Sequence, residues 1–251
     1  MLILRSLLFN IAFYLNLLFW MLALLPTLPL PRGVFMRGAR LWARTSMWLM
    51  RVIVGTKVEF RGLDSIPSGG LLVAAKHQSV WETFALLTLF ADPAFILKRE
   101  LMWIPFFGWY TWKGGSVPVN RKGGAQALLH MMSRARGEIE QGRQILIFPE
   151  GTRRPAGAPP AYKFGIGHLY QHLGAPCLPV ALNSGLFWPR RRFLRRPGTI
   201  VVEILDVIPP GMPRNAFFKE MQERIETASD RLVAEGLREL AATGLPNTAE
   251  A

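Results

Sequence analysis

The chain opens with a long apolar stretch. No charged residue interrupts the sequence between Arg5 and Arg32, and a helix needs about 20 apolar residues to cross the hydrocarbon layer of a bilayer. This pattern predicts a membrane helix that ends at Pro26, Pro29 and Pro31. A secretory signal peptide is the alternative, but the apolar region is too long for one and no cleavage site of small residues closes it.

The next segment, residues 34–55, mixes arginines with Met, Trp and Leu. Helical spacing gathers much of this positive charge on one side, as in helices that lie at the interface of an anionic membrane. We therefore expect residues 1–53 to form a membrane-embedded helical hairpin. The pattern fits a first helix that spans the bilayer and equally one that is only embedded in it. If the helix spans, the arginines after it indicate that the rest of the chain is cytoplasmic.

The remainder of the chain, residues 54–242, alternates short runs of Val, Ile and Leu with helical patterns, and residues 243–251 form a loose tail. Such alternation predicts an α/β fold, with a mostly parallel central sheet flanked by helices. The expected strands are 51–60, 71–75, 116–120, 145–148, 178–182 and 199–205, and the expected helices are 81–90, 125–141 and 215–240.

Composition narrows the class of partner. Lys and Arg number 30 against 17 Asp and Glu, and half of the residues are hydrophobic, a combination that favours an anionic lipid surface over nucleic acid. Cys177 is the only cysteine, which excludes a disulfide framework and a Cys-based zinc site. It lies in an apolar run typical of a strand, and its side chain is predicted to be buried. No Walker A loop, Rossmann fingerprint or zinc spacing is visible, so we expect no metal and no bound cofactor.

One strand end carries a pair of residues suited to proton transfer. His77 stands just past the run 71–75, and Glu82 follows five residues later at the start of a helical pattern. In α/β folds ligands bind at such strand ends. A carboxylate there can accept a hydrogen bond from one imidazole nitrogen and support the positive charge that forms when the other nitrogen takes a proton. A simple capping role for Glu82 is the alternative.

A second group of residues suits an anionic substrate. The segment FPEGTR at 148–153 follows a strand with Glu150, Gly151, Thr152 and Arg153, where glycine permits close backbone approach and the guanidinium offers paired donors to a phosphate. Glu150 is expected to organise this loop. Further cations that can meet the same anion are Arg121, Lys98 and Lys163.

Taken together, these motifs resemble those of the glycerolipid acyltransferase family. The family's NHxxxxD motif matches at His77, its second motif ends in an arginine that matches Arg121, its FPEGTR motif matches residues 148–153 letter for letter, and its strand with a central proline matches around Pro179. Lys98 and Lys163 also fit. Two positions depart from the pattern: Lys76 replaces the usual asparagine, and Glu82 replaces the usual aspartate.

The resemblance implies an O-acyltransferase at a bacterial inner membrane. His77, oriented by Glu82, would be the general base, with acyl-ACP or acyl-CoA as donor and a lysophospholipid, 1-acylglycerol 3-phosphate, as acceptor. Arg121, Arg153 and Lys98 or Lys163 would hold the acceptor phosphate. Another lysolipid, such as a lyso amino-acid lipid, or glycerol 3-phosphate is the alternative acceptor, and a peripheral protein that only binds anionic membrane lipids is the non-enzymatic alternative.

The run RRRFLRR at 190–196 concentrates positive charge in a short stretch. Apposition to anionic lipid is one interpretation. Docking of acidic acyl carrier protein or of the phosphates of coenzyme A is another, and a solvated basic loop is the third.

Overall fold

A computed structural model gives the fold and describes residues 1–120 and 123–242. The α-helices are α1 Leu2–Ala23, α2 Arg32–Leu49, α3 Trp81–Ala85, α4 Phe107–Lys113, α5 Gly124–Glu140, α6 Gly165–Leu173, α7 Ser184–Phe187 and α8 Arg214–Ala242. The strands are β1 Thr56–Arg61, β2 Leu71–Ala75, β3 Pro93–Lys98, β4 Val117–Val119, β5 Gln144–Ile147, β6 Cys177–Leu182 and β7 Gly198–Ile204. Short 3-10 turns span Leu25–Thr27, Leu63–Ser65, Leu86–Thr88 and Arg99–Trp103, and a π-helical turn spans Met50–Val54.

The strands form a seven-stranded sheet in the order β1-β7-β6-β2-β5-β3-β4. Every neighbouring pair is parallel except β6 and β7. This confirms the expected α/β class with a mostly parallel sheet. The tail at 243–251 lies outside the described residues.

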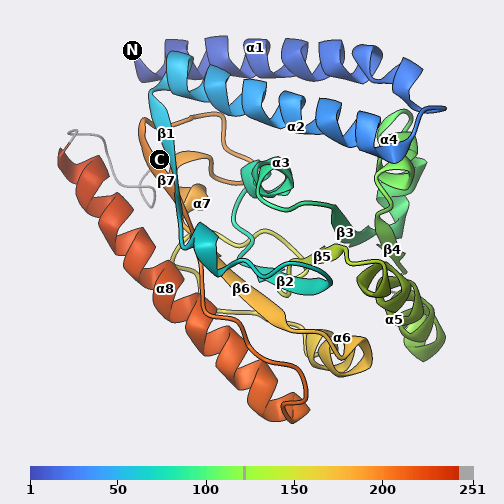
Figure 1. The fold of residues 1–251 in the computed structure, drawn as a ribbon. Coiled ribbons are helices and arrows are strands. Elements are labelled where there is room, and N and C mark those ends of the chain that lie inside the picture. Colours follow the sequence, from blue (N-terminus) through green and yellow to red (C-terminus); the bar gives the residue numbers. More distant parts are fainter. Residues whose placement is uncertain (121–122, 243–251) are drawn as a thin grey trace.

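Helices cover both faces of the sheet because successive strand side chains point to opposite sides. Leu71, Val73 and Ala75 of β2 belong to one apolar cluster with residues of α1, α2 and α3, whereas Leu72 and Ala74 belong to a second cluster with residues of α5, α6 and α8. Figure 1 shows α1 and α2 side by side along the top of the molecule, with α8 across the opposite side. The central strand is therefore buried on both faces, which explains its uninterrupted apolar run.

α4, α6 and α7 were not among the expected helices, and two segments differ from the strands that the sequence predicted. The run 51–60 was expected to be one strand, but Met50–Val54 continues the second helix as a π-helical turn. Met50 and Val54 are both buried, so this stretch follows helical spacing, and Gly55, at φ 89°, ends the helix in the left-handed conformation that glycine adopts freely. β3 is the other difference, because no strand was expected at 93–98.

The structure contains one helical segment long and apolar enough to cross a membrane, Leu2–Thr27, among the residues that it describes. Only 17% of its most apolar window is buried inside the protein. The buried side chains Phe9 and Phe13 pack against Trp188 of the α/β domain. Many other apolar side chains of α1 are exposed, among them Ile3, Leu7, Ile11, Leu15 and Leu18, as expected of a helix with lipid on one side.

Candidate active site

The candidate catalytic residues lie where three neighbouring strands end. β2 sits between β5 and β6 and runs parallel to both, so the carboxyl ends of all three meet at one edge of the sheet. His77 lies two residues past β2, Phe148 directly follows β5, and Ser184 lies two residues past β6. Three segments that are distant in the sequence therefore contribute to one site.

His77 and Glu82 form the hydrogen bond that their spacing suggested. Nδ1 of His77 lies 2.8 Å from Oε1 of Glu82. The same carboxylate oxygen accepts the backbone N–H of Gln78 at 2.8 Å and of Ser79 at 2.6 Å. Because Oε1 of Glu82 already accepts two backbone N–H groups, it acts as an acceptor toward the ring, and Nδ1 of His77 carries the proton. The lone pair then resides on Nε2, which no residue of the described ranges bonds.

The ring of His77 is fixed from a second direction. Phe148 stacks on it with 4.0 Å between centroids and 16° between planes, and the backbone N–H of Arg154 donates to the carbonyl of His77 at 2.8 Å. The His77 side chain is 13% exposed. The imidazole is therefore held in one orientation while part of it stays accessible.

Ser184 supports the dyad and was not foreseen. Its hydroxyl donates to Oε2 of Glu82 at 2.7 Å, so the fully buried Glu82 accepts four hydrogen bonds in all. The next residue, Gly185, donates its N–H to Oε1 of Gln78 at 3.0 Å. The only sequence signal is that Ser184 follows a strand end, and the neighbouring position of β6 and β2 cannot be read from sequence.

Lys76, which replaces the usual asparagine, is buried in an ionic cluster. Its ammonium lies 3.2 Å from Glu150 Oε1 and 2.7 Å from Glu226 Oε1, and its side chain is 3% exposed. Tyr162 donates its hydroxyl to the same oxygen of Glu226 at 2.6 Å. Burial raises the pKa of Glu150, while Lys76 opposes that shift. The cluster links the FPEGTR loop to α8, and Glu150 sits inside it, as a loop-organising residue would.

Arg153 is half-buried near the dyad. Burial lowers the pKa of its guanidinium, with a further lowering from the charge of Arg190, while the charge of Glu82 raises it. Gly151 adopts φ 70° in the turn before it, a left-handed conformation that favours glycine. Thr152 is exposed.

The two lysines of the proposed phosphate site are more peripheral. Lys98, at the end of β3, has a side chain 49% exposed and lies 3.5 Å from Glu100. Lys163 is exposed, and its backbone N–H donates to the carbonyl of Pro149 at 2.9 Å. Arg121 lies outside the described residues.

We searched residues 1–120 and 123–242 for clusters of metal-binding side chains and for a reactive thiol. These ranges hold no group of three or more His, Cys, Asp or Glu side chains that could bind a metal ion. Cys177 is fully buried in β6, and burial raises the pKa of its thiol. An inert structural thiol fits this environment.

Comparison with known proteins supplies the family context. Residues 57–183, half of the chain, match the model of a family described as Acyltransferase. A 1-acyl-sn-glycerol-3-phosphate acyltransferase of Pseudomonas aeruginosa is 39% identical over 171 residues, which cover 68% of this chain and 65% of that protein. A mouse protein named 1-acyl-sn-glycerol-3-phosphate acyltransferase alpha is 28% identical over 159 residues, which cover 62% of this chain and 56% of that protein.

A solved structure matches nearly the whole chain. The crystal structure of the 1-acyl-sn-glycerophosphate (LPA) acyltransferase PlsC from Thermotoga maritima superposes with a TM-score of 0.78, at 23% identity, over 92% of this chain and 98% of that one. At 23% identity this match shows similarity of fold alone. The chain spans less than two thirds of the length of the Pseudomonas and mouse relatives.

Proposed function

This chain belongs to the acyltransferase family, and from that premise we propose that it moves a fatty acyl group from a thioester to the free hydroxyl of 1-acylglycerol 3-phosphate, yielding phosphatidic acid. The observation that carries the proposal is the His77–Glu82 hydrogen bond, with Nε2 of His77 left free at the edge of the sheet. The names of the Pseudomonas and mouse relatives support this acceptor.

In the proposed reaction Nε2 of His77 takes the proton of the acceptor hydroxyl while that oxygen attacks the carbonyl carbon of the thioester. The carbon–sulfur bond then breaks, and the departing thiolate takes the proton from His77. Glu82 stabilises the imidazolium formed in between, because its carboxylate faces Nδ1. A base positioned in this way contributes roughly 10²–10⁴-fold to the rate.

Direct transfer is favoured over an acyl-enzyme intermediate. A serine or cysteine nucleophile needs a base within hydrogen-bonding reach. The hydroxyl of Ser184 donates to Glu82 rather than to His77, and Cys177 is fully buried in β6. The proposed donor is therefore a substrate, acyl-ACP or acyl-CoA, that binds together with the acceptor, and no resident cofactor is part of the mechanism.

The proposed site of action is the cytoplasmic face of the bacterial inner membrane, with α1 lying in the near leaflet. α1 is held to the rest of the protein near both ends: the backbone N–H of Arg195 donates to the hydroxyl of Ser6 at 2.9 Å, and Tyr110 of α4 donates its hydroxyl to the carbonyl of Met21. Midway, Asn16 donates to Ser46 of α2 at 3.0 Å. A helix attached along its length to a folded domain cannot stand across a bilayer by itself, which supports embedding over spanning.

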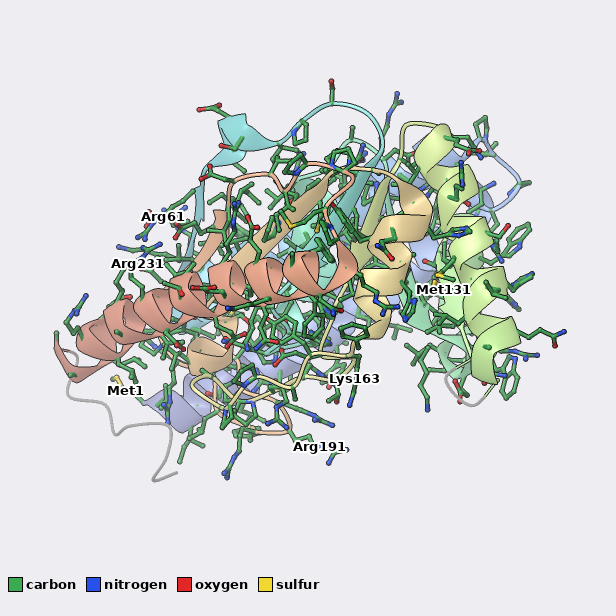
Figure 2. The ribbon with its side chains drawn as sticks, turned by 90° about the horizontal axis from the view of Figure 1, so that it is seen from below. Met1, Arg61, Met131, Lys163, Arg191 and Arg231 are labelled. Carbon is green, nitrogen blue, oxygen red and sulfur yellow. The ribbon has the colours of Figure 1, made fainter. Side chains whose placement is uncertain are left out.

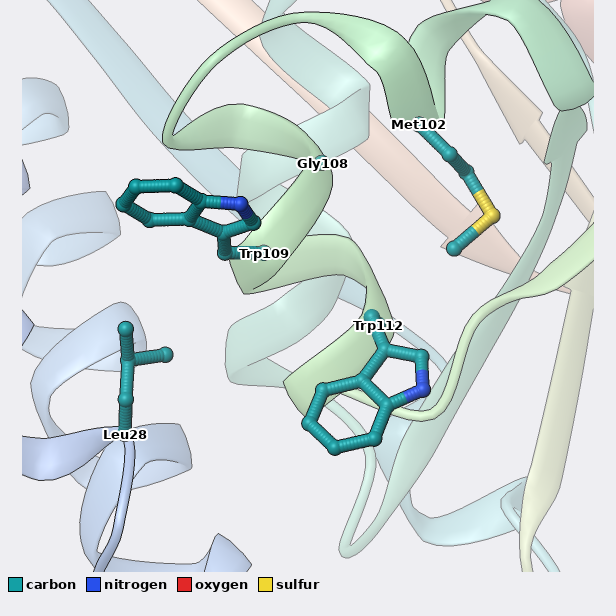
Figure 3. A pocket seen from close by; sticks show the side chains of 5 residues that line it. All are labelled: Leu28, Met102, Gly108, Trp109 and Trp112. Carbon is teal, nitrogen blue, oxygen red and sulfur yellow. The ribbon is translucent and has the colours of Figure 1, made fainter.

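A patch of tryptophans beside the end of α1 is suited to the same membrane. An open apolar pocket of about 430 Å³ is lined by Leu28, Met102, Gly108, Trp109 and Trp112, and Figure 3 shows the two indole rings on the same side as Leu28. Trp109 is 53% exposed and Trp112 67% exposed. Trp is favoured at the membrane interface because its ring is apolar and its N–H is polar.

The test is acyl transfer by the purified protein in mixed micelles, with radiolabelled acyl-CoA and acyl-ACP each offered to 1-acylglycerol 3-phosphate, glycerol 3-phosphate and a lyso amino-acid lipid. The proposal requires labelled phosphatidic acid as the main product. A product made only from another acceptor would replace the substrate. No product from any pair of substrates, with vesicle binding intact, would leave the peripheral lipid-binding protein as the function.

A further inference from the structure

The arginine run that follows α7 divides into two functional parts. Arg195 is 8% exposed and Arg196 is 4% exposed. The guanidinium of Arg195 donates to three backbone carbonyls of its own loop and lies 4.8 Å from the ring of Trp188. The side chain of Arg195 therefore holds the loop together, and the backbone N–H of Arg196 donates to the carbonyl of Phe187 at 3.0 Å. Arg190 is half-buried, whereas Arg191 and Arg192 are exposed.

Arg190 and Arg191 extend the positive charge of Arg153. Nη1 of Arg190 donates to the backbone carbonyl of Arg153 at 2.9 Å. The charges of both Arg190 and Arg191 lower the pKa of Arg153. Within the described part of the chain, no carboxylate forms an ion pair with any of these arginines. Neighbouring guanidinium groups repel one another, and an anion with more than one negative charge relieves that repulsion.

The backbone brings Arg191 into this position at a cost. Arg191 has φ 58°, a left-handed conformation that is unfavourable for a residue with a Cβ atom. Such conformations concentrate at ligand-binding sites. In Figure 2, Arg191 lies at the edge of the molecule, away from Arg231 on α8, so its side chain remains open to a ligand.

We infer that Arg190 and Arg191 join Arg153 in binding the phosphate monoester of the acceptor. In 1-acylglycerol 3-phosphate the reacting hydroxyl and the phosphate ester sit on adjacent carbons, so the phosphate must bind close to His77. Arg153 meets this requirement, because the backbone N–H of the next residue, Arg154, donates to the carbonyl of His77 at 2.8 Å. The phosphate of a thioester donor lies at the far end of the long pantetheine arm and binds farther from the reacting carbonyl. This inference rests on the proposed function and adds two residues to its acceptor site.

The test compares three single variants, Arg190→Gln, Arg191→Gln and Arg192→Gln. Each removes one positive charge from the same run, and Arg192→Gln is the matched control. The first two raise the KM for 1-acylglycerol 3-phosphate by roughly tenfold or more, the effect of losing one hydrogen bond to a charged group, while kcat and the KM for the acyl donor stay within about twofold. Arg191→Gln alters an exposed side chain, so it keeps the test valid if Arg190→Gln does not fold.

A second acceptor identifies the group that is recognised. With 1-acylglycerol, which lacks the phosphate, the slow acylation by Arg191→Gln matches that of the wild type. Two results overturn the inference: a rise in the KM for the donor instead of the acceptor, or equal effects of all three substitutions together with weaker binding to phosphatidylglycerol vesicles. If the wild type acylates 1-acylglycerol 3-phosphate and Arg191→Gln behaves as Arg192→Gln does, this inference alone fails. If the wild type acylates none of the acceptors, the proposed function fails and the inference with it.

Discussion

At the residue scale, the carboxylate of Glu82 determines which nitrogen of His77 carries the proton. It accepts the backbone N–H of Gln78 and of Ser79 as well as the hydroxyl of Ser184, so it stays an acceptor and directs the free lone pair of His77 outward. Glutamate is longer than the usual aspartate, yet its Oε1 reaches Nδ1 at 2.8 Å. The start of α3 therefore accommodates the longer side chain.

Replacing Glu82 with Gln tests this orientation. The amide cannot stabilise an imidazolium as a carboxylate does, and it offers an N–H to the ring, so we expect kcat to fall by roughly 10²–10⁴-fold. Ser184→Ala removes one of the four hydrogen bonds to Glu82 and should lower kcat by less than about tenfold. Steady-state kinetics on both variants measure the difference. Equal losses in kcat for the two would contradict the role given to Glu82.

Lys76→Met tests the buried ionic cluster. It leaves Glu150 and Glu226 without their shared cation, and loss of one partner from a buried ion pair costs about 3–5 kcal/mol of unfolding free energy. Without Lys76 the rise that burial gives to the pKa of Glu150 loses the charge that mainly opposes it, so the folded protein binds more protons at this carboxyl than the unfolded chain does. Stability then falls as pH rises above the unfolded glutamate pKa of about 4.3.

The deficit of Lys76→Met relative to wild type should therefore grow between about pH 5 and pH 8. Urea denaturation in detergent across this range gives the unfolding free energies. Lys57→Met, at an exposed position of β1, is the control and should change stability by less than about 0.5 kcal/mol. A deficit that does not depend on pH would show that the carboxyls do not carry the effect.

At the element scale, the turn into α4 depends on one glycine. A Cβ at Gly108 would lie 1.9 Å from the backbone carbonyl oxygen of Met102, and backbone cannot move aside as a flexible side chain can. Gly108 also donates its N–H to the carbonyl of Ile104 at 2.8 Å. The α4 turn, with its exposed tryptophans, is therefore built on this close approach.

We expect Gly108→Ala to lower the unfolding free energy by about 1–3 kcal/mol. Gly137→Ala in α5 is the opposite case, because nothing lies within 4 Å of the added Cβ, and it should stabilise the helix by about 0.5–1 kcal/mol. Thermal unfolding of the two variants in the same detergent measures both. A neutral Gly108→Ala would refute the tight packing of this turn.

Strands and helices could be predicted from the sequence where a single hydrophobic pattern runs through the whole element. The run at 71–75 is apolar at every position and is a strand buried on both faces. β3 was missed although residues 94–97 are a run of consecutive apolar residues, because the run begins after a proline and is too short for its period to separate a strand from a helical segment. The run 51–60 contains two elements with different periods, and only the left-handed Gly55 marks the boundary between them.

At the scale of the whole molecule, the order of strands brings the site together, and that order cannot be read from the sequence. His77 and Glu82 were paired correctly because five positions separate them. Glu226 reaches Lys76 across 150 residues, and Ser184 reaches Glu82 across 102. The sequence gives no signal for these contacts, since they depend on β6 lying beside β2 and on α8 crossing the sheet.

The attachment of α1 to the domain leads to a prediction about membrane topology. A cysteine introduced at the exposed position Ile3 should react with a membrane-impermeant maleimide only in inside-out vesicles, where the cytoplasmic face is accessible. The single native thiol, Cys177, is fully buried and gives little background. A helix lying in one leaflet keeps both of its ends on the same side. Labelling only in right-side-out vesicles would show that α1 spans the bilayer.

The role of His77 as general base is tested most directly by single-turnover acyl transfer with His77→Ala, at saturating 1-acylglycerol 3-phosphate and acyl donor. We predict that the rate of the chemical step falls by roughly 10²–10⁴-fold, while substrate binding and thermal unfolding remain as in the wild type. A folded His77→Ala protein that forms phosphatidic acid within about twofold of the wild-type rate would contradict the mechanism.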